Sequence, residues 1–326
     1  MARAASATIA EAVEALRAGE LVAFPTETVY GLGANAADPL AVARIFALKG
    51  RPADHPLIVH LGSQHHLHEW ARELPPVAAR LADEFWPGPL TLILPKAPHV
   101  NTVVTGGQDS IGIRVPSHPI AQQLLAAFGG GIAAPSANRY GRLSPTRAEH
   151  VREEFGDKVR VLLDGGESQI GLESTIVACL GHGARLLRPG SITRTQIEQV
   201  IGELDQGADA APRASGDRPQ HYAPRTRLQI VAGEALDAHA ARLASGGHRV
   251  AVLAMHGAAR AAPNVVWIDA GGQPAAYAHN LYDNLRTLDR MDCGWILVEA
   301  PPAHEEWSAV LDRLQRASEQ DGNDAP

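Results

Sequence analysis

Cysteine is scarce in this chain, which carries two cysteines among its 326 residues. Cys179 and Cys293 stand far apart in unrelated contexts, so the sequence predicts no disulfide framework and no cysteine zinc site, and it fits a reducing compartment. Long apolar runs are also missing, and the segment from Met1 to Thr8 lacks the apolar centre of a secretory signal. Because a membrane helix needs about 20 apolar residues, we expect a cytoplasmic protein without a membrane span.

The familiar nucleotide-binding and nucleophile motifs are missing too. The chain has no Gly-x4-Gly-Lys-Ser/Thr loop, and Ser136 does not stand in a Gly-x-Ser-x-Gly elbow, which excludes a P-loop and argues against a serine hydrolase. Lysine occurs only at Lys49, Lys96 and Lys158. The formal net charge is −7, and broad, non-specific nucleic-acid binding needs a positive face. A local basic pocket remains compatible with this composition.

The length and the order of apolar segments predict two mixed α/β domains. We place the first at residues 1–204, a linker rich in Asp, Gln, Gly, Ala and Pro at 205–226, a second domain at 227–318 and a frayed tail at 319–326. The second domain alternates short strands and helices in a small Rossmann-like pattern, but it lacks a Gly-x-Gly-x-x-Gly turn. Dinucleotide binding is therefore not indicated.

Helix caps and apolar runs predict the elements of the first domain. Thr8 with Glu11 and Thr146 with Glu149 have capping-box spacing, and Asp38 precedes a proline at the first helical position. The expected helices are 8–19, 38–50, 75–86, 119–129, 146–155 and 193–204, and the expected strands are 21–24, 57–61, 90–94, 111–115, 132–134, 159–163, 175–179 and 185–187.

Polar residues next to Gly and Pro at the ends of these strands are the candidate site. Glu27 lies between the hydroxyls of Thr26 and Thr28, an arrangement that equally suits a hydroxyl-capped turn. Lys49 and Arg51 flank Gly50 and suit a polyphosphate, although Lys and Gly at a helix end are also ordinary capping residues.

Two further segments carry polar groups after apolar strands. Arg114 ends an apolar strand, where it needs an anion; a bound carboxylate and a structural salt bridge are the alternatives. Small polar residues after the strand at 132–134 suit close contact with a phosphate or an adenine edge: Ser136, Asn138 and Ser144. The histidines at 65, 66 and 68 lack matching ligand spacing, so a solvated helix face is the favoured interpretation over a metal site.

Together these motifs resemble the YrdC-like family in its long, two-domain form. The resemblance is carried by Phe24–Gly33, Lys49–Pro52, Pro135–Asn138, Arg188–Gly190 and the linker sequence His221–Pro224. It implies a twisted mixed sheet with helices, followed by a Rossmann-like domain. The implied activity is that of an L-threonylcarbamoyladenylate synthase, a nucleotidyltransferase that forms threonylcarbamoyl-AMP and pyrophosphate from L-threonine, bicarbonate and ATP.

The resemblance also implies roles for single residues. Those matching the threonine contacts are Thr28, His60, Arg114, Ala134 and Ser174. Those matching the ATP contacts are Lys49, Arg51, His55, Ser110, Ser136, Asn138, Ser144 and Arg188, of which Lys49 and Arg51 are the expected catalytic cations. Mg²⁺ is expected to arrive with ATP, without a metal site of the protein's own. His55 stands where the family often has Asn, and Ala214 removes a serine contact from the linker.

The implied product would pass to a tRNA-modifying threonylcarbamoyl transferase complex. Direct tRNA binding by this chain is not expected, since residues 226–326 carry eight basic and 13 acidic side chains. Two other hypotheses remain open at this point. One is a non-catalytic nucleotide- or RNA-binding module that uses the same pocket, and the other is a carbamoyl transfer enzyme that uses carbamoyl phosphate.

Overall fold

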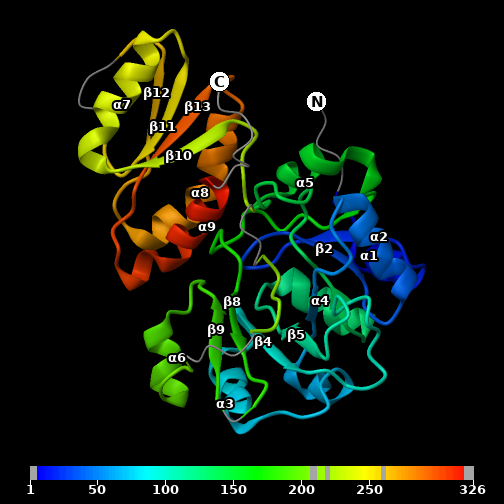
Figure 1. The fold of residues 1–326 in the computed structure, drawn as a ribbon. Coiled ribbons are helices and arrows are strands. Elements are labelled where there is room, and N and C mark those ends of the chain that lie inside the picture. The colour runs from blue at the N-terminus through cyan, green and yellow to red at the C-terminus, as the bar shows by residue number, and fades with distance from the viewer. Residues whose placement is uncertain (1–5, 182, 206–210, 217–220, 258–261, 319–326) are drawn as a thin grey trace. The chain divides into compact units, whose positions relative to one another are not determined.

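The computed structural model describes residues 6–181, 183–205, 211–216, 221–257 and 262–318. Contacts divide the chain into two compact units (Figure 1). Unit 1 comprises Met1–Tyr140 and Pro145–Asp217, and unit 2 comprises Gly141–Ser144 and Arg218–Pro326. The division falls inside the predicted linker, and residues 211–216 of that linker pack with unit 1. The predicted tail at 319–326 lies outside the described residues.

Unit 1 is built on a nine-stranded mixed sheet in the order β7-β1-β2-β6-β3-β5-β4-β8-β9. Its strands are β1 (Val22–Phe24), β2 (Gly31–Asn35), β3 (Ile58–His60), β4 (Leu90–Pro95), β5 (Ser110–Arg114), β6 (Ile132–Ala133), β7 (Val161–Leu162), β8 (Thr175–Ala178) and β9 (Arg185–Arg188). The twisted mixed sheet expected from the sequence is confirmed. Strand β2 was not predicted, because its glycines mimic a loop. A Cβ atom at Gly33 would come within 2.9 Å of Phe24 on β1, so glycine permits this close strand packing.

The helices of unit 1 begin and end largely where their caps indicate. They are α1 (Ile9–Arg17), α2 (Pro39–Lys49), η1 (Gln64–Glu69), α3 (Pro76–Phe85), α4 (Pro119–Phe128), α5 (Ala148–Phe155), η2 (Gly156–Lys158) and α6 (Arg194–Ile201). The Thr8 capping box is confirmed, but the predicted box from Thr146 to Glu149 is wrong. Arg147 is the N-cap of α5, since the Thr146 amide instead donates to His150 Nδ1 at 3.2 Å.

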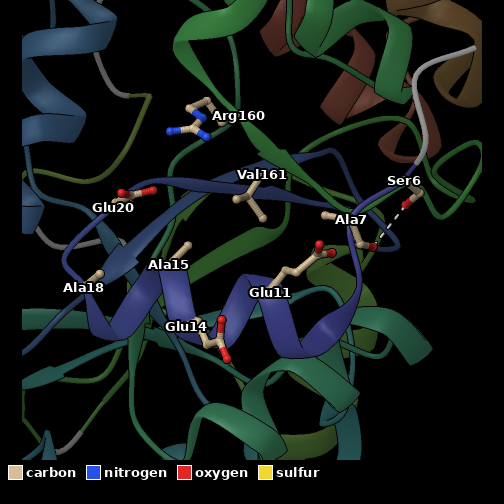
Figure 2. Close-up of a pocket in the computed structure, with 9 residues that line it drawn as sticks. All are labelled: Ser6, Ala7, Glu11, Glu14, Ala15, Ala18, Glu20, Arg160 and Val161. Carbon is tan, nitrogen blue, oxygen red and sulfur yellow. Dashed lines mark hydrogen bonds between the residues drawn. The ribbon is translucent and has the colours of Figure 1, made fainter.

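A groove of about 560 Å³ runs between α1 and β7. Glu11 and Glu14 project from α1, while Arg160 and Val161 come from the β7 side (Figure 2). The Glu11 carboxylate already accepts the amide of Thr8 at 2.7 Å. No residue predicted for the site lines this groove, so the groove is not the predicted substrate site.

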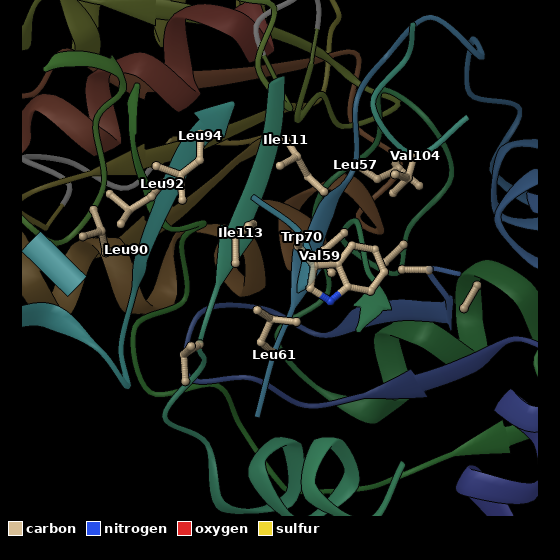
Figure 3. Close-up of a cluster of buried hydrophobic side chains, with 14 of the residues drawn as sticks. Leu57, Val59, Leu61, Trp70, Leu90, Leu92, Leu94, Val104, Ile111 and Ile113 are labelled. Atoms are coloured by element: carbon tan, nitrogen blue, oxygen red, sulfur yellow. The ribbon is translucent and has the colours of Figure 1, made fainter. Parts of the chain in front are cut away.

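One face of the central strands builds the main core (Figure 3). Alternate residues of β3, β4 and β5 point into it, among them Val59, Leu92 and Ile113, and Trp70 packs beside them. Because side chains alternate along a strand, the intervening residues must lie on the opposite face of the sheet. That second face carries His60, Ser110, Arg114 and Arg188 among the predicted polar residues.

The strand register places those residues in one row. His60 is paired with Arg114 across β3 and β5, and continuing the β5–β4 register sets Arg114 opposite Thr91. Thr91 is paired with Ile176, and Ile176 with Arg188. Residues directly opposite each other share a face. We call the face that carries His60, Arg114, Thr91, Ile176 and Arg188 the site face.

Unit 2 folds around a four-stranded parallel sheet in the order β10-β13-β11-β12. Its elements are β10 (Arg227–Val231), α7 (Gly233–Ser245), β11 (Val250–Ala254), β12 (Val265–Asp269), α8 (Pro274–Asp289), β13 (Trp295–Glu299), η3 (Glu305–Trp307) and α9 (Ser308–Ser318). The crossovers through α7 and α8 run in opposite directions, which places these helices on opposite faces of the sheet (Figure 1). The Rossmann-like expectation is confirmed. Within the described residues, no helix is long and apolar enough to cross a membrane.

Candidate active site

Lys49 ends α2 and turns into the protein interior. Gly50 follows in the left-handed conformation, with φ 66°, and directs the chain away from the helix. The Lys49 ammonium donates to the carbonyl of Ser136 at 2.6 Å and to that of Asn138. The side chain is buried, and burial together with the neighbouring Arg51 guanidinium lowers its pKa. An exposed helix-capping role therefore does not describe Lys49.

The loop after β6 wraps around this lysine. Ser136 forms an isolated bridge with Gly31 at the start of β2, and the Tyr140 amide donates to the Lys49 carbonyl at 2.9 Å. The Tyr140 hydroxyl lies 3.3 Å from His55 Nδ1, and the two rings meet edge to face. The structure thus brings Lys49, Ser136, Asn138 and His55 into one cluster, and their binding of a nucleotide stays a prediction.

Arg114 is buried at the end of β5 and has three partners. Its Nη1 donates to Thr28 Oγ1 at 2.8 Å and its Nε to the Gly88 carbonyl at 3.2 Å. Its Nη2 lies 2.6 Å from Glu27 Oε1. The salt-bridge alternative is therefore present in the structure. The hydroxyl turn is present as well, because Thr26 Oγ1 accepts the amides of Thr28 and Val29.

His60 lies beside Arg114 on the site face and is buried. Burial, reinforced by the Arg114 charge, lowers the pKa of His60 to about 3. The imidazole is therefore neutral at physiological pH and is suited to hydrogen bonding rather than to charge pairing. Its Nδ1 is buried without a hydrogen-bond partner among the described residues, so it is available to a ligand hydroxyl or amine.

Ser174 and Arg188 form a second polar cluster on the same face. Arg188 donates through Nη2 to the Ser174 carbonyl at 2.9 Å and to its hydroxyl at 3.1 Å. The Ser174 hydroxyl also lies 2.8 Å from that of Thr91. Arg188 Nη1 donates to the Ser215 carbonyl at 2.8 Å, and Arg51 Nη2 approaches the Ser215 hydroxyl at 3.5 Å. Ser215 thereby connects two of the predicted phosphate-binding cations.

Residues 211–216 of the predicted linker lie against the site face. Ala214 packs on Ile58, Ile93 and Ile176. These three isoleucines are the apolar part of the site face, and we call them the floor. Arg213 anchors the segment, because its amide donates to Gln108 Oε1 at 2.8 Å and its guanidinium to the Gly106 carbonyl at 2.8 Å. This segment covers the floor through Ala214, the position at which the resemblance led us to expect a serine.

The remaining predicted residues differ in how far they join these clusters. Ser110 is buried at the start of β5. The Ala134 amide donates to the Ile58 carbonyl at 2.9 Å, which places Ala134 beside β3, and its contact with a ligand stays a prediction. Ser144 is buried but belongs to the short segment of unit 2, and its position relative to Lys49 stays a prediction.

Two hydroxyl residues of these clusters were not predicted from the sequence, whereas His65, His66 and His68 are exposed on η1, as expected for a solvated helix face. Thr91 and Ser215 gave no motif, because a single hydroxyl in a strand or linker is unremarkable. His66 lies on η1, exposed, with its Nδ1 2.9 Å from Glu69 Oε1. The described residues hold no group of three or more His, Cys, Asp or Glu side chains that could bind a metal.

Comparisons with known proteins show the family to which the chain belongs. Residues 14–190 match the family Sua5_yciO_yrdC, described as "Telomere recombination". Residues 192–319 match a family described as "Threonylcarbamoyl-AMP synthase, C-terminal domain". A threonylcarbamoyl-AMP synthase from Pyrococcus abyssi is 43% identical over 93% of this chain and 92% of its own length. One from Bacillus subtilis is 42% identical over 95% and 92%.

A solved structure is similar over the same length. The crystal structure of P. abyssi Sua5 complexed with L-threonine has a TM-score of 0.87 and 42% sequence identity, and covers 95% of this chain and 94% of the other. The match therefore extends through both units. The chain belongs to the Sua5, YciO and YrdC family, in the form that carries the threonylcarbamoyl-AMP synthase C-terminal domain.

Proposed function

We propose that this protein is an L-threonylcarbamoyl-AMP synthase. It joins L-threonine, bicarbonate and ATP to form threonylcarbamoyl-AMP, with release of pyrophosphate and water. The observation that carries the proposal is a pair of buried polar clusters in unit 1. In one, Arg114 lies beside the Thr28 hydroxyl; in the other, Lys49 holds the Ser136 loop, and Arg51 and Arg188 meet at Ser215. The first arrangement suits an amino acid and the second a polyphosphate.

The two clusters divide the substrates between them. We assign L-threonine to Thr28, His60, Arg114, Ala134 and Ser174. We assign ATP to Lys49, Arg51, His55, Ser110, Ser136, Asn138, Ser144 and Arg188. Support comes from direct contacts within each group, such as Arg114 with Thr28 and Lys49 with the loop at Ser136. Arg188 touches Ser174 and so lies where the two groups meet.

The chemistry needs orientation and charge neutralisation more than a protein nucleophile. Threonine's amine and bicarbonate give an N-carboxylate, whose oxygen attacks the α-phosphorus of ATP while pyrophosphate leaves. Lys49, Arg51 and Arg188 supply fixed positive charge for the phosphates, and such preorganised donors are worth about 10²–10³-fold in rate each. We propose that Mg²⁺ accompanies ATP, where it would neutralise part of the phosphate charge alongside Lys49, Arg51 and Arg188.

Mass spectrometry of the reaction products tests the proposal. The full chain with L-threonine, bicarbonate, Mg²⁺ and ATP is expected to form threonylcarbamoyl-AMP and one equivalent of pyrophosphate, with neither formed when threonine is omitted. ATP binding without any adenylate would identify a binding module instead. Product from carbamoyl phosphate but not from bicarbonate and ATP would identify a carbamoyl transfer enzyme.

The product's chemistry indicates its destination. An acyl adenylate is a mixed anhydride that transfers its acyl group readily, so it suits a following acceptor enzyme. We propose that a tRNA-modifying threonylcarbamoyl transferase complex consumes it in the cytoplasm. Adding such a complex and tRNA to the reaction is expected to convert the adenylate into threonylcarbamoyladenosine, which nucleoside analysis of the digested tRNA would detect.

A further inference from the structure

Glu27 is a buried carboxylate that the substrate assignments leave without a role. Its side chain is 3% exposed, and Oε1 lies 2.6 Å from Arg114 Nη2. Neither of its oxygens has an aligned hydrogen bond among the described residues. A buried carboxylate without hydrogen-bond donors is costly, so the arrangement as it stands is incomplete.

A purely structural role explains this pair poorly. Buried ion pairs contribute little net stability, because desolvation offsets their attraction. The Thr26–Val29 turn is already held by the Thr26 hydroxyl and needs no carboxylate. The turn itself therefore does not explain Glu27, whose one charged contact in the described residues is Arg114.

The charges of the pair match those of a free amino acid. Arg114 and Glu27 already form a neutral pair, so a carboxylate without an ammonium group would compete with Glu27 for the same guanidinium. His118, the other titratable group near Glu27, does not supply a counter-charge, because burial lowers its pKa despite the Glu27 charge. A ligand with both a carboxylate and an ammonium group keeps the site neutral and offers three N–H donors to the bare carboxylate.

We propose that Glu27 binds the α-ammonium group of the substrate while Arg114 binds its α-carboxylate, so that the buried pair selects a zwitterionic amino acid. Thr28 contacts Arg114 through its hydroxyl, and His60 is paired with Arg114 across β3 and β5, so both lie beside the proposed carboxylate position. The inference rests on the proposed function for the identity of the amino acid. It makes Glu27 a specificity-determining residue in direct contact with substrate.

Calorimetric binding with two matched probes tests this assignment. L-Threonine is compared with 2,3-dihydroxybutanoate of the same stereochemistry, which replaces the ammonium group by a hydroxyl. The wild type is expected to bind threonine about 10- to 100-fold more tightly, the range expected for a charge-assisted hydrogen bond. In Glu27→Gln this ratio falls toward one, because threonine binding weakens while the dihydroxy acid binds as well as before or better.

Three comparisons keep the outcome unambiguous. Glu299→Gln removes another buried carboxylate, in unit 2, and is expected to leave the ratio unchanged. The affinity of Glu27→Gln for ATP reports whether this variant still folds. If the variant does not fold, the ratio of the two probe affinities in the wild type decides the proposal. If Glu27→Gln lost affinity for both probes equally, Glu27 would only hold Arg114 in place, and the proposal would be overturned. A wild type that binds both probes equally would also overturn it, whereas no threonine binding at all would overturn the proposed function itself.

Discussion

The sequence shows the chemical type of each residue at this site, but only the fold shows which residues it contacts. An arginine at the end of an apolar strand requires an anion, and the sequence therefore predicted Arg114 as a site residue. The choice between a ligand and a salt bridge depended on Glu27, 87 positions away in the chain. Nothing in local spacing encodes that contact, because Glu27 lies between β1 and β2 and Arg114 ends β5, and only the folded chain brings them together.

Lys49 combines a structural and a proposed catalytic role, and one substitution is expected to remove both. Lys49→Ala leaves the carbonyls of Ser136 and Asn138 without their donor, so we expect a loss of about 1–3 kcal/mol in the free energy of unfolding. It also removes a fixed cation from the phosphate site, so threonine-dependent pyrophosphate release falls by at least about 100-fold. Urea unfolding and a pyrophosphate assay measure the two effects.

Lys96 provides the matched control. It is also a buried lysine, and it donates to the carbonyl of Val100 at 3.3 Å. Lys96→Ala is expected to lower stability by a similar amount but to keep pyrophosphate release within about twofold of the wild type. Equal losses of activity in the two variants would mean that Lys49 acts through stability alone.

At the scale of elements, caps and apolar runs predicted helices better than strands. Asp38, Pro39 and Gly50 mark both ends of α2, and the structure follows them. The short strand β2 escaped prediction because Gly31 and Gly33 suit a loop equally well, and only the crowding against Phe24 explains them. The Thr146 box failed because the His150 ring competes for the same amide, a contact that spacing rules do not include.

The docked segment 211–216 offers a prediction at this scale. Ala214 fits the floor of Ile58, Ile93 and Ile176 because it is small, so Ala214→Trp should overpack the floor and lift the segment. The Arg213 amide, which donates to Gln108 in the docked state, is then expected to exchange its hydrogen at least about tenfold faster. Hydrogen exchange followed by mass spectrometry measures this rate. Ala211→Trp, at an exposed position of the same segment, should leave it unchanged, and equal rates in both variants would contradict docking on the floor.

For the whole molecule, composition and element order predicted two α/β units, but the units are not two uninterrupted stretches of chain. The segment Gly141–Ser144 interrupts unit 1 and belongs to unit 2. There the Gly141 carbonyl accepts the Ala223 amide at 2.8 Å, and the Leu143 carbonyl accepts from Arg286 Nη2 at 2.5 Å. A boundary drawn from composition cannot detect a four-residue excursion of this kind. The consequence is that residues of unit 2 hold the short segment that carries Ser144.

Arg286→Ala tests this dependence in the full chain. Losing the bond to the Leu143 carbonyl should free the Ser144 loop, so the KM for ATP is expected to rise about three- to tenfold, the effect of one lost hydrogen bond, while the KM for threonine stays unchanged. Steady-state pyrophosphate release measured at varied ATP and at varied threonine separates the two constants. Arg290→Ala, at an exposed position directly after the same helix, serves as the control. If the KM for threonine rose as much as that for ATP, Arg286 would act through general destabilisation of the chain and not through the loop.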